Sequence, residues 1–311
     1  MKFGIHNPSF DFGTDAAGIF PALAAKARWA EAHGFSWFSV MDHLIQIPPA
    51  GPQDRPFIEG WTALSALAAV TTRIRLATLA SSVAYRNPAH LAKIAAGVDH
   101  ISAGRLTLGI GGGWFDAEYR QYGWEFPPRP GTRLRQMEEA VRLIKAMWTQ
   151  PRTTFHGKWF HAEDAILEPK PIQRPHPPIM IAGSGEQVTL RLVAQHGDAC
   201  NVFGAPDEVA AKYAILRGHC EAVGRPYEAI ERTNLTSLLL ARDEAALAAK
   251  RDRLVAASGV PFRGHGLTLA AAPGVIAAYR DAGVQTFICS AFGNDAETLE
   301  LLAAEVMPRF A

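Results

Sequence analysis

The sequence predicts one (β/α)8 TIM barrel, because short apolar runs alternate with helix-length amphipathic stretches from one end to the other. Its 311 residues suit this fold, which usually needs about 250 residues plus insertions. Apolar residues make up 48% and charged residues 20%, so the chain can bury a large core and leaves little room for disorder. A long doubly wound sheet would show a similar alternation, but the units do not divide into the two halves of that fold.

The first half of the chain gives four strand–helix units. Phe20, Leu23 and Ala27 recur at helical spacing, and Gly34 ends their helix. Pro88 fits the first turn of the third helix, where a missing amide costs nothing, and Gly104 closes that helix. The expected strands are residues 2–6, 37–41, 74–79 and 106–110. The helix that carries Phe20 should cover about 17–33, and two further helices are expected at about 61–70 and 134–148.

The second half gives four more strands and two insertion segments. His156 and Gly157 lie between two β-rich runs, which predicts a small hairpin within an insertion near 151–177. A second irregular segment, near 257–272, is expected to cover the barrel. The expected strands are residues 179–182, 199–203, 235–241 and 286–290, and a final helix should cover about 296–306. Residues 1–311 therefore read as a single domain.

Charge and cysteine content exclude several classes of function. Lys plus Arg number 31 against 30 for Asp plus Glu, so no net field attracts nucleic acid or anionic membranes. Cys200, Cys220 and Cys289 are far apart and form no Cys-x-x-Cys pair, which predicts free thiols and a reducing, cytoplasmic location. The N-terminal residues lack the apolar core of a signal peptide, and no apolar run reaches the roughly 20 residues that span a bilayer.

Two candidate sites follow the second and third strands, at the barrel end where such folds keep their reactive groups. Asp42 and His43 come directly after the second strand. A histidine there can exchange a proton near neutral pH, and the carboxylate can fix its tautomer, although a capping Asp beside a solvent-facing His is the plainer reading. Ser81, Ser82 and Val83 follow the third strand, where small hydroxyl residues let a flat ring approach the backbone.

Two glycine-rich segments are the other candidates. Gly111, Gly112 and Gly113 end the fourth strand and allow close approach of a ligand, beside Trp114 as a pocket wall; a flexible hinge is the alternative. The segment 183–185, Gly-Ser-Gly, follows the fifth strand and opens a helix expected near Gln187. Free amides at a helix start suit a phosphate, although a plain cap by Ser184 explains the pattern equally.

Other catalytic classes lack their motifs. No His-Glu-x-x-His occurs, and His156, His161 and His176 have no carboxylates at ligand spacing, so we expect no metal site. The Gly-x-Ser-x-Gly elbow of hydrolases and the P-loop lysine are also missing.

The order of these motifs resembles the luciferase-like monooxygenase superfamily, especially its F420-dependent oxidoreductases. The most specific stretches are 86–95 (RNPAHLAKIA), 99–106 (DHISAGRL) and 108–115 (LGIGGGWF). The resemblance covers nearly the whole chain and implies a bacterial-luciferase-like barrel. It also implies the deazaflavin coenzyme F420 as redox cofactor, with FMN as the alternative.

The resemblance further implies a role for each candidate segment. Asp42 and His43 would face the ring, and the Ser82–Val83 bond would be a non-proline cis peptide behind it. Gly111, Gly112 and Gly113 would approach the ribityl chain. Gly183, Ser184 and Gly185 would hold the phosphate.

One departure and several alternatives remain. Where sugar-phosphate dehydrogenases of this group carry an acid after the glycine run, this chain has Trp114, which speaks against sugar-phosphate oxidation. We expect Asp116 and Glu118, which could supply an acid, to be solvated loop charges. The expected function is hydride transfer between F420 and a small organic molecule; the alternatives are an FMN-dependent monooxygenase supplied by a partner reductase and a non-catalytic flavin-binding barrel. Residues 63–69 could also pair two copies of the chain.

Overall fold

The computed structural model describes residues 1–310. Within that range, eight parallel strands form a closed ring, because β9 pairs with β10 as well as with β8. Their order around the ring is β10, β12, β1, β2, β3, β5, β8, β9. Their bounds are β1 (Lys2–Asn7), β2 (Trp37–Val40), β3 (Arg75–Thr78), β5 (Leu106–Gly111), β8 (Ile179–Ala182), β9 (Ala199–Val202), β10 (Glu231–Ala241) and β12 (Thr286–Ala291). The predicted (β/α)8 barrel is therefore confirmed.

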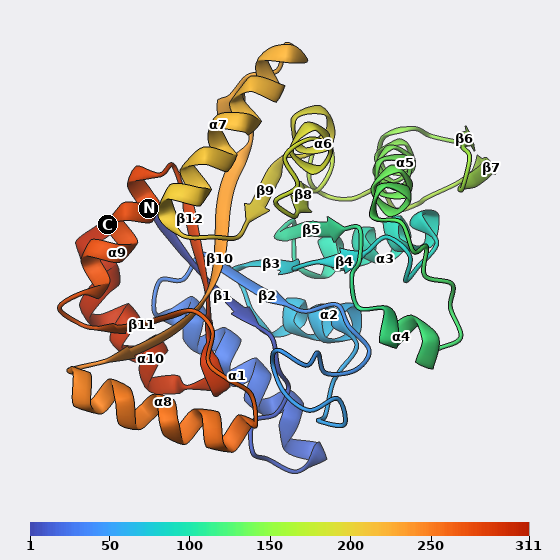
Figure 1. Cartoon of the computed structure of the whole chain (residues 1–311). Coiled ribbons are helices and arrows are strands. Elements are labelled where there is room, and N and C mark those ends of the chain that lie inside the picture. Colours follow the sequence, from blue (N-terminus) through green and yellow to red (C-terminus); the bar gives the residue numbers. More distant parts are fainter. Residues whose placement is uncertain (311) are drawn as a thin grey trace.

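Helices surround the strands (Figure 1). Their apolar sides cover the strands, and the main core of buried side chains lies between the two layers. The helices are α1 (Ile19–Ala32), α2 (Gly60–Val70), α3 (Pro88–Ile101), α4 (Asp116–Gln121), α5 (Pro130–Thr149), α6 (Thr189–His196), α7 (Pro206–Ala222), α8 (Glu244–Ser258), α9 (Ala272–Asp281) and α10 (Ala296–Leu301). Short helical turns cover Ala16–Gly18, Tyr227–Ala229, Phe292–Asn294, Leu302–Val306 and Met307–Phe310.

A second, smaller core fills the inside of the barrel. It is made of side chains from five strands or their ends, which are Trp37, Ala77, Leu79, Met180, Ala199 and Ile288. Gly4 makes room for the largest of them, since a Cβ at this glycine would lie 2.8 Å from Cβ of Trp37. The barrel interior is therefore packed, and open space remains at the carboxyl ends of the strands.

Both segments that were predicted to be insertions contain regular structure. The first forms a hairpin of β6 (Thr153–His156) and β7 (His161–Ala165). Glu139 of α5 holds its tip by accepting hydrogen bonds from the amides of Lys158, Trp159 and Phe160. The second insertion, expected to be irregular, contains a strand, β11 (His265–Thr268), that extends the sheet beside β10. The short strand β4 (Ser81–Ser82) pairs with β5 in the same way.

The structure also bears on three sequence expectations: the cysteines, membrane spans and the small-residue stretch of residues 63–69. The three cysteines are buried and unpaired by disulfides. No helix among residues 1–310 combines the length and apolar character needed to cross a bilayer. Ala63 and Ala68, in the small-residue stretch of α2, pack in the core.

Candidate active site

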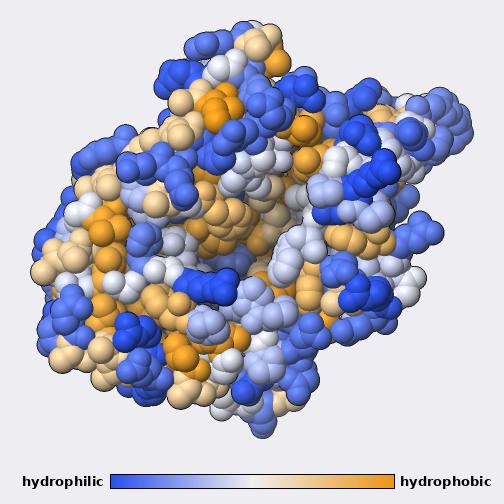
Figure 2. Space-filling view, in the orientation of Figure 1, coloured by the Kyte–Doolittle hydropathy of each residue, from blue (hydrophilic) through white to orange (hydrophobic). Residues whose placement is uncertain are grey.

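A cavity of about 1190 Å³ opens at the carboxyl ends of the strands. Residues that follow β1, β2, β3, β5, β8, β9 and β12 contribute to its lining, together with residues 235–237 within β10. Figure 2 shows a hollow near the middle of the molecule with apolar side chains around it. The cavity is large enough for a tricyclic ring with its side chain, because pockets for such ligands are typically about 300–1,000 Å³.

The structure brings six of the predicted site residues together in the cavity lining and leaves the other four outside it. The lining includes His43, Ser82, Gly111, Gly112, Gly113 and Gly183. Asp42, Val83, Ser184 and Gly185 are outside it. The four predicted segments thus converge on one mouth, although not every residue in them faces the open space.

His43 is held by a buried carboxylate. Its Nδ1 lies 2.8 Å from Oε2 of Glu118, which is fully buried at the start of α4. An ionised carboxylate only accepts, so Nδ1 carries a proton and donates it to Glu118. Nε2 makes no hydrogen bond within residues 1–310 and is left as the reactive nitrogen of a ring that lines the cavity.

Glu118 stays ionised despite its burial. Burial alone would raise the pKa of its carboxyl group, but hydrogen bonds from His43, Tyr85 and the amide of Leu44 outweigh it and place the pKa below its usual value. The pKa of the Tyr85 hydroxyl is raised by burial and by the adjacent charge of Glu118, so this hydroxyl remains a donor. The expectation that Glu118 is a solvated loop charge was wrong, because α4 turns it inward; Asp116 is exposed and pairs with Arg120.

Asp42 lies behind His43 and is committed to a salt bridge. Arg86 donates from both terminal nitrogens to its carboxylate, at 2.7 and 2.9 Å. The same guanidinium also reaches Glu59, whose carboxylate caps α2 through the amides of Trp61 and Thr62. Asp42 is fully buried. The geometry therefore gives it a supporting role, fixing the segment from which His43 projects.

The cavity wall after β3 differs from the expectation in the position of its cis peptide bond. The non-proline cis peptide bond is Leu79–Ala80, and the predicted Ser82–Val83 bond is not cis. The reason is that β3 ends at Thr78, so Leu79 and Ala80 form the wall, while Ser81 and Ser82 already pair with β5 as β4. Val83 lies in the hydrophobic core.

Hydroxyl groups fix this wall from behind. Ser81 accepts from Nε1 of Trp61 at 3.0 Å and donates to Thr78 at 3.1 Å. Ser82 forms a hydrogen bond with the hydroxyl of Tyr119, whose pKa burial raises to about 12. The wall is therefore built from neutral groups.

Only glycine fits at Gly113. Its φ is +74°, and a Cβ there would lie 2.3 Å from Oγ of Ser82 and 2.9 Å from the hydroxyl of Tyr119. Gly111 and Gly112 leave the lining free of side chains on this side. This is a cradle of exposed backbone that a ligand can approach closely.

The Gly-Ser-Gly segment after β8 is arranged differently from expectation. Helix α6 begins at Thr189, two residues beyond the predicted start near Gln187. Oγ of Ser184 accepts from the amide of Phe203 at 3.1 Å, which ties this loop to the end of β9. Gly183, with φ of +135°, is the member that lines the cavity.

A second histidine in the cavity was missed by the sequence analysis. His6 is the second-last residue of β1 and lines the cavity, and its Nδ1 lies 3.0 Å from Oγ of Ser39. Burial, followed by the nearby charge of Lys26, lowers the pKa of His6 to about 3. It is therefore a neutral hydrogen-bonding group. Its position as a polar residue at a strand's carboxyl end was the available signal.

Among residues 1–310, no group of three or more His, Cys, Asp or Glu side chains is arranged to hold a metal ion. The donor set of the cavity is instead a histidine with a free nitrogen, backbone groups of glycines and small hydroxyls. These features fit a flat ring with a polar tail.

Comparisons with known proteins show which sequences this chain resembles. A protein of Mycobacterium bovis described as uncharacterized is 35% identical over 225 residues, which cover 68% of this chain and 77% of the relative. The FMNH2-dependent dimethylsulfone monooxygenase of Pseudomonas putida is 32% identical over 145 residues, 44% of this chain and 39% of that enzyme.

Solved structures extend the likeness of fold over the whole chain. The F420-dependent secondary alcohol dehydrogenase, solved with an F420-acetone adduct, superposes with a TM-score of 0.83 at 18% identity and covers 98% of both chains. The EDTA monooxygenase of Chelativorans sp. BNC1 gives 0.82 at 16% identity, with 99% of this chain and 93% of that enzyme covered. The sequence profile of the luciferase-like monooxygenases matches residues 1–300. The chain therefore belongs to the luciferase-like monooxygenase family.

Proposed function

We propose that this chain is an F420-dependent oxidoreductase that transfers a hydride between the deazaflavin ring and a small organic substrate. The observation that carries the proposal is the fixed tautomer of His43, whose free Nε2 belongs to a ring lining the cavity. A bound deazaflavin supplies the hydride chemistry, and the protein supplies position and proton management.

The neighbouring residues have complementary tasks. The wall of Leu79 and Ala80 and the glycines 111–113 present a surface that a planar ring can lie against. Gly183, Ser184 and Gly185 would hold the phosphate, with backbone amides before α6 as donors. Asp42, through Arg86, would keep His43 in place. His43 would hold or release one proton at Nε2 as the hydride moves.

A titration tests the choice of cofactor. Purified protein is titrated with F420 and with FMN, and binding is followed by the change in cofactor fluorescence. We expect F420 to bind with a Kd in the range of about 1–100 μM and FMN to bind at least about tenfold more weakly. Clear FMN binding without F420 binding would exclude the deazaflavin.

Substitution of the histidine tests the chemistry. His43→Ala should lower turnover by about 10²-fold or more while the Kd for F420 changes little. His90→Ala is the matched control, because His90 is exposed on α3 and outside the cavity lining. An equal loss of binding and turnover in His43→Ala would mean that His43 only binds.

The second candidate is an FMN-dependent monooxygenase. The observation that favours it is the 32% identity to an enzyme described as FMNH2-dependent. A partner reductase would then supply reduced flavin. Oxygen uptake with reduced FMN and an organic substrate distinguishes this function, and tight cofactor binding without turnover on a broad substrate panel would indicate a non-catalytic flavin-binding barrel.

A further inference from the structure

The cavity continues beyond the glycine cradle to a second end. This end is formed by the loop after β1, the loop of residues 47–55, the segment after α8 and the turn after β12. Much of its lining is apolar, with Pro8, Phe12, Pro48, Pro52, Val260 and Pro261. We call it the distal end, and it offers room for a second molecule beside the ring.

The arginine and carboxylate side chains of the cavity lining belong to this end. They are two arginines, Arg55 and Arg263, and one carboxylate, Asp11. Arg55 pairs with Asp11 at 3.0 Å, and both side chains remain partly exposed. Arg263 makes no hydrogen bond or ion pair within residues 1–310. The distal end therefore carries one guanidinium more than it has carboxylates to neutralise.

The backbone fixes the position of Arg263. The next residue, Gly264, has a φ of +148°, and a Cβ there would lie 2.3 Å from the carbonyl oxygen of Ser237 in β10. Only glycine permits this close approach. The segment after α8 therefore packs directly against the end of the barrel at β10. Arg263 is thus held at the mouth by the scaffold.

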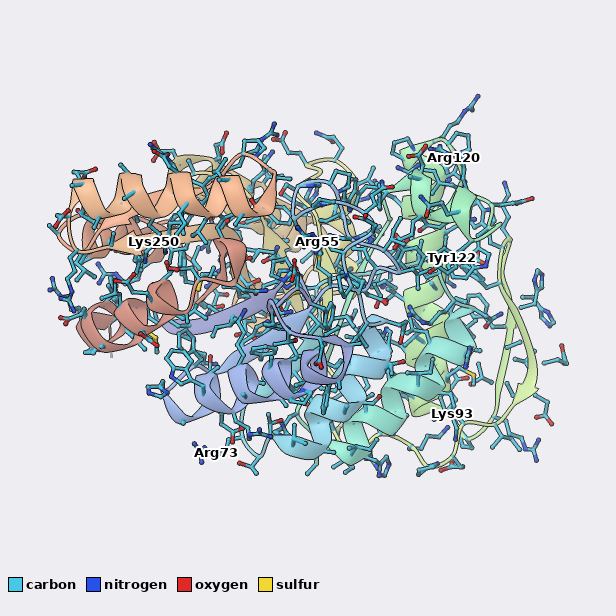
Figure 3. The ribbon with its side chains drawn as sticks, turned by 90° about the horizontal axis from the view of Figure 1, so that it is seen from below. Arg55, Arg73, Lys93, Arg120, Tyr122 and Lys250 are labelled. Atoms are coloured by element: carbon cyan, nitrogen blue, oxygen red, sulfur yellow. The ribbon has the colours of Figure 1, made fainter. Side chains whose placement is uncertain are left out.

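Arg55 lines the same cavity, but it lies in the loop of residues 47–55, in the first half of the sequence. Its loop is folded by turns in which the amide of Ala50 donates to Ile47 and that of Arg55 donates to Pro52. Figure 3 shows Arg55 near the centre of the view, between α8 and the segment that carries Arg120 and Tyr122. Asp11, its partner, follows β1, which three strands separate from β8 in either direction around the barrel. The Arg55–Asp11 pair is therefore remote from the predicted phosphate segment.

We infer that the distal end binds a small organic acid, with its carboxylate on Arg55 and Arg263 and its apolar body toward the ring. Guanidinium groups hold carboxylates through paired, charge-assisted hydrogen bonds, and the apolar lining suits the rest of such a molecule. This inference rests on the proposed function for the identity of the ring. It names the substrate class of the same site.

The test uses benzoate and its neutral isostere benzamide as probes. Protein saturated with oxidised F420 is titrated with each by calorimetry. We expect benzoate to bind at least about tenfold more tightly than benzamide, and Arg263→Gln or Arg55→Gln to remove about tenfold of that affinity. Asp11→Asn should tighten benzoate binding, because it removes a competing carboxylate from Arg55.

The control is Arg251→Gln. Arg251 lies on α8, pairs with its neighbour Asp252 and is outside the cavity lining, so this variant should bind benzoate like the unaltered protein. Equal binding of benzoate and benzamide would overturn the inference. So would variants of Arg55 and Arg263 that weaken F420 and leave benzoate unchanged, since the anion would then be the cofactor's own.

The same titration on protein without cofactor separates the two proposals. Charge-selective benzoate binding that the arginine variants abolish supports the acid site even if neither F420 nor FMN binds. In that case the proposed function fails and the substrate class stands.

Discussion

Nδ1 of His43 lies 2.8 Å from Oε2 of Glu118, a residue 75 positions further along the chain. Because this carboxylate fixes the tautomer, Glu118→Gln should lower turnover by about 10²-fold while the Kd for the cofactor stays within about threefold. The amide of glutamine can donate to Nδ1 and leave the proton on Nε2. A shifted pH profile of turnover would show that the protonation of His43 has changed.

Asp116→Asn is the matched control for that variant, since Asp116 lies on the same helix but is exposed and pairs with Arg120. Its turnover should be unaltered. If Glu118→Gln behaves like this control, Glu118 is a structural residue only.

Arg86 should be a major stabilising residue, because its removal leaves the fully buried Asp42 without a partner. Breaking such a pair costs about 3–5 kcal/mol, so Arg86→Met should lower the free energy of unfolding by this order in urea titrations. Arg120→Gln breaks an exposed pair and should cost about 0.5 kcal/mol or less. Similar losses in both variants would show that the buried charge network does not stabilise the site.

Gly113→Ala should damage cofactor binding through a steric effect. The new Cβ would displace Ser82 and Tyr119, and we expect the Kd to rise at least about tenfold. Gly123→Ala is the control, because Gly123 has a similar φ of +71° and open space around it. Both variants bear the backbone cost of about 1–2 kcal/mol, but only Gly113→Ala should lose affinity.

The protein should lose stability as pH falls below about 6.5, partly because of His6. Its pKa in the folded chain is lowered to about 3, so between these values the unfolded chain binds a proton that the folded chain does not. The contribution of neutral His6 to the free energy of unfolding is complete above about pH 6.5. Between the two pKa values, His6 lowers the free energy of unfolding by about 1.4 kcal/mol for each unit that the pH falls. His6→Gln should flatten the pH dependence of unfolding between pH 6.5 and 4.5 relative to the unaltered protein, as measured by urea titration. An unchanged slope would contradict the burial of a neutral His6.

The fold could be predicted from the sequence because each strand is a short buried run. The predicted strand of residues 179–182 matches β8, and the other strands shift by a few residues. Where a predicted strand boundary was wrong, pairing with a strand far away in the sequence set the true boundary. β10 begins at Glu231, earlier than expected, because its first residues pair with β9.

The site was predicted less completely for the same reason. The sequence pointed to His43 by its position after a strand and to Gly113 by the run of glycines. Both features can be recognised from neighbouring residues alone. Glu118 was missed, because its burial depends on α4 folding back against the end of β2. Asp42 sits beside His43 in the chain, but only the position of Arg86 shows that it faces away from the cavity.

The packed barrel interior has a consequence for kinetics. Trp37 and its neighbours fill the barrel beneath the mouth, so cofactor and substrate must occupy one shared chamber rather than chambers at opposite ends. Because the proposed hydride transfer passes directly from one ligand to the other, both would have to be bound together, and neither could leave through a rear exit. Reciprocal plots of initial rate at several cofactor concentrations should consequently intersect rather than run parallel.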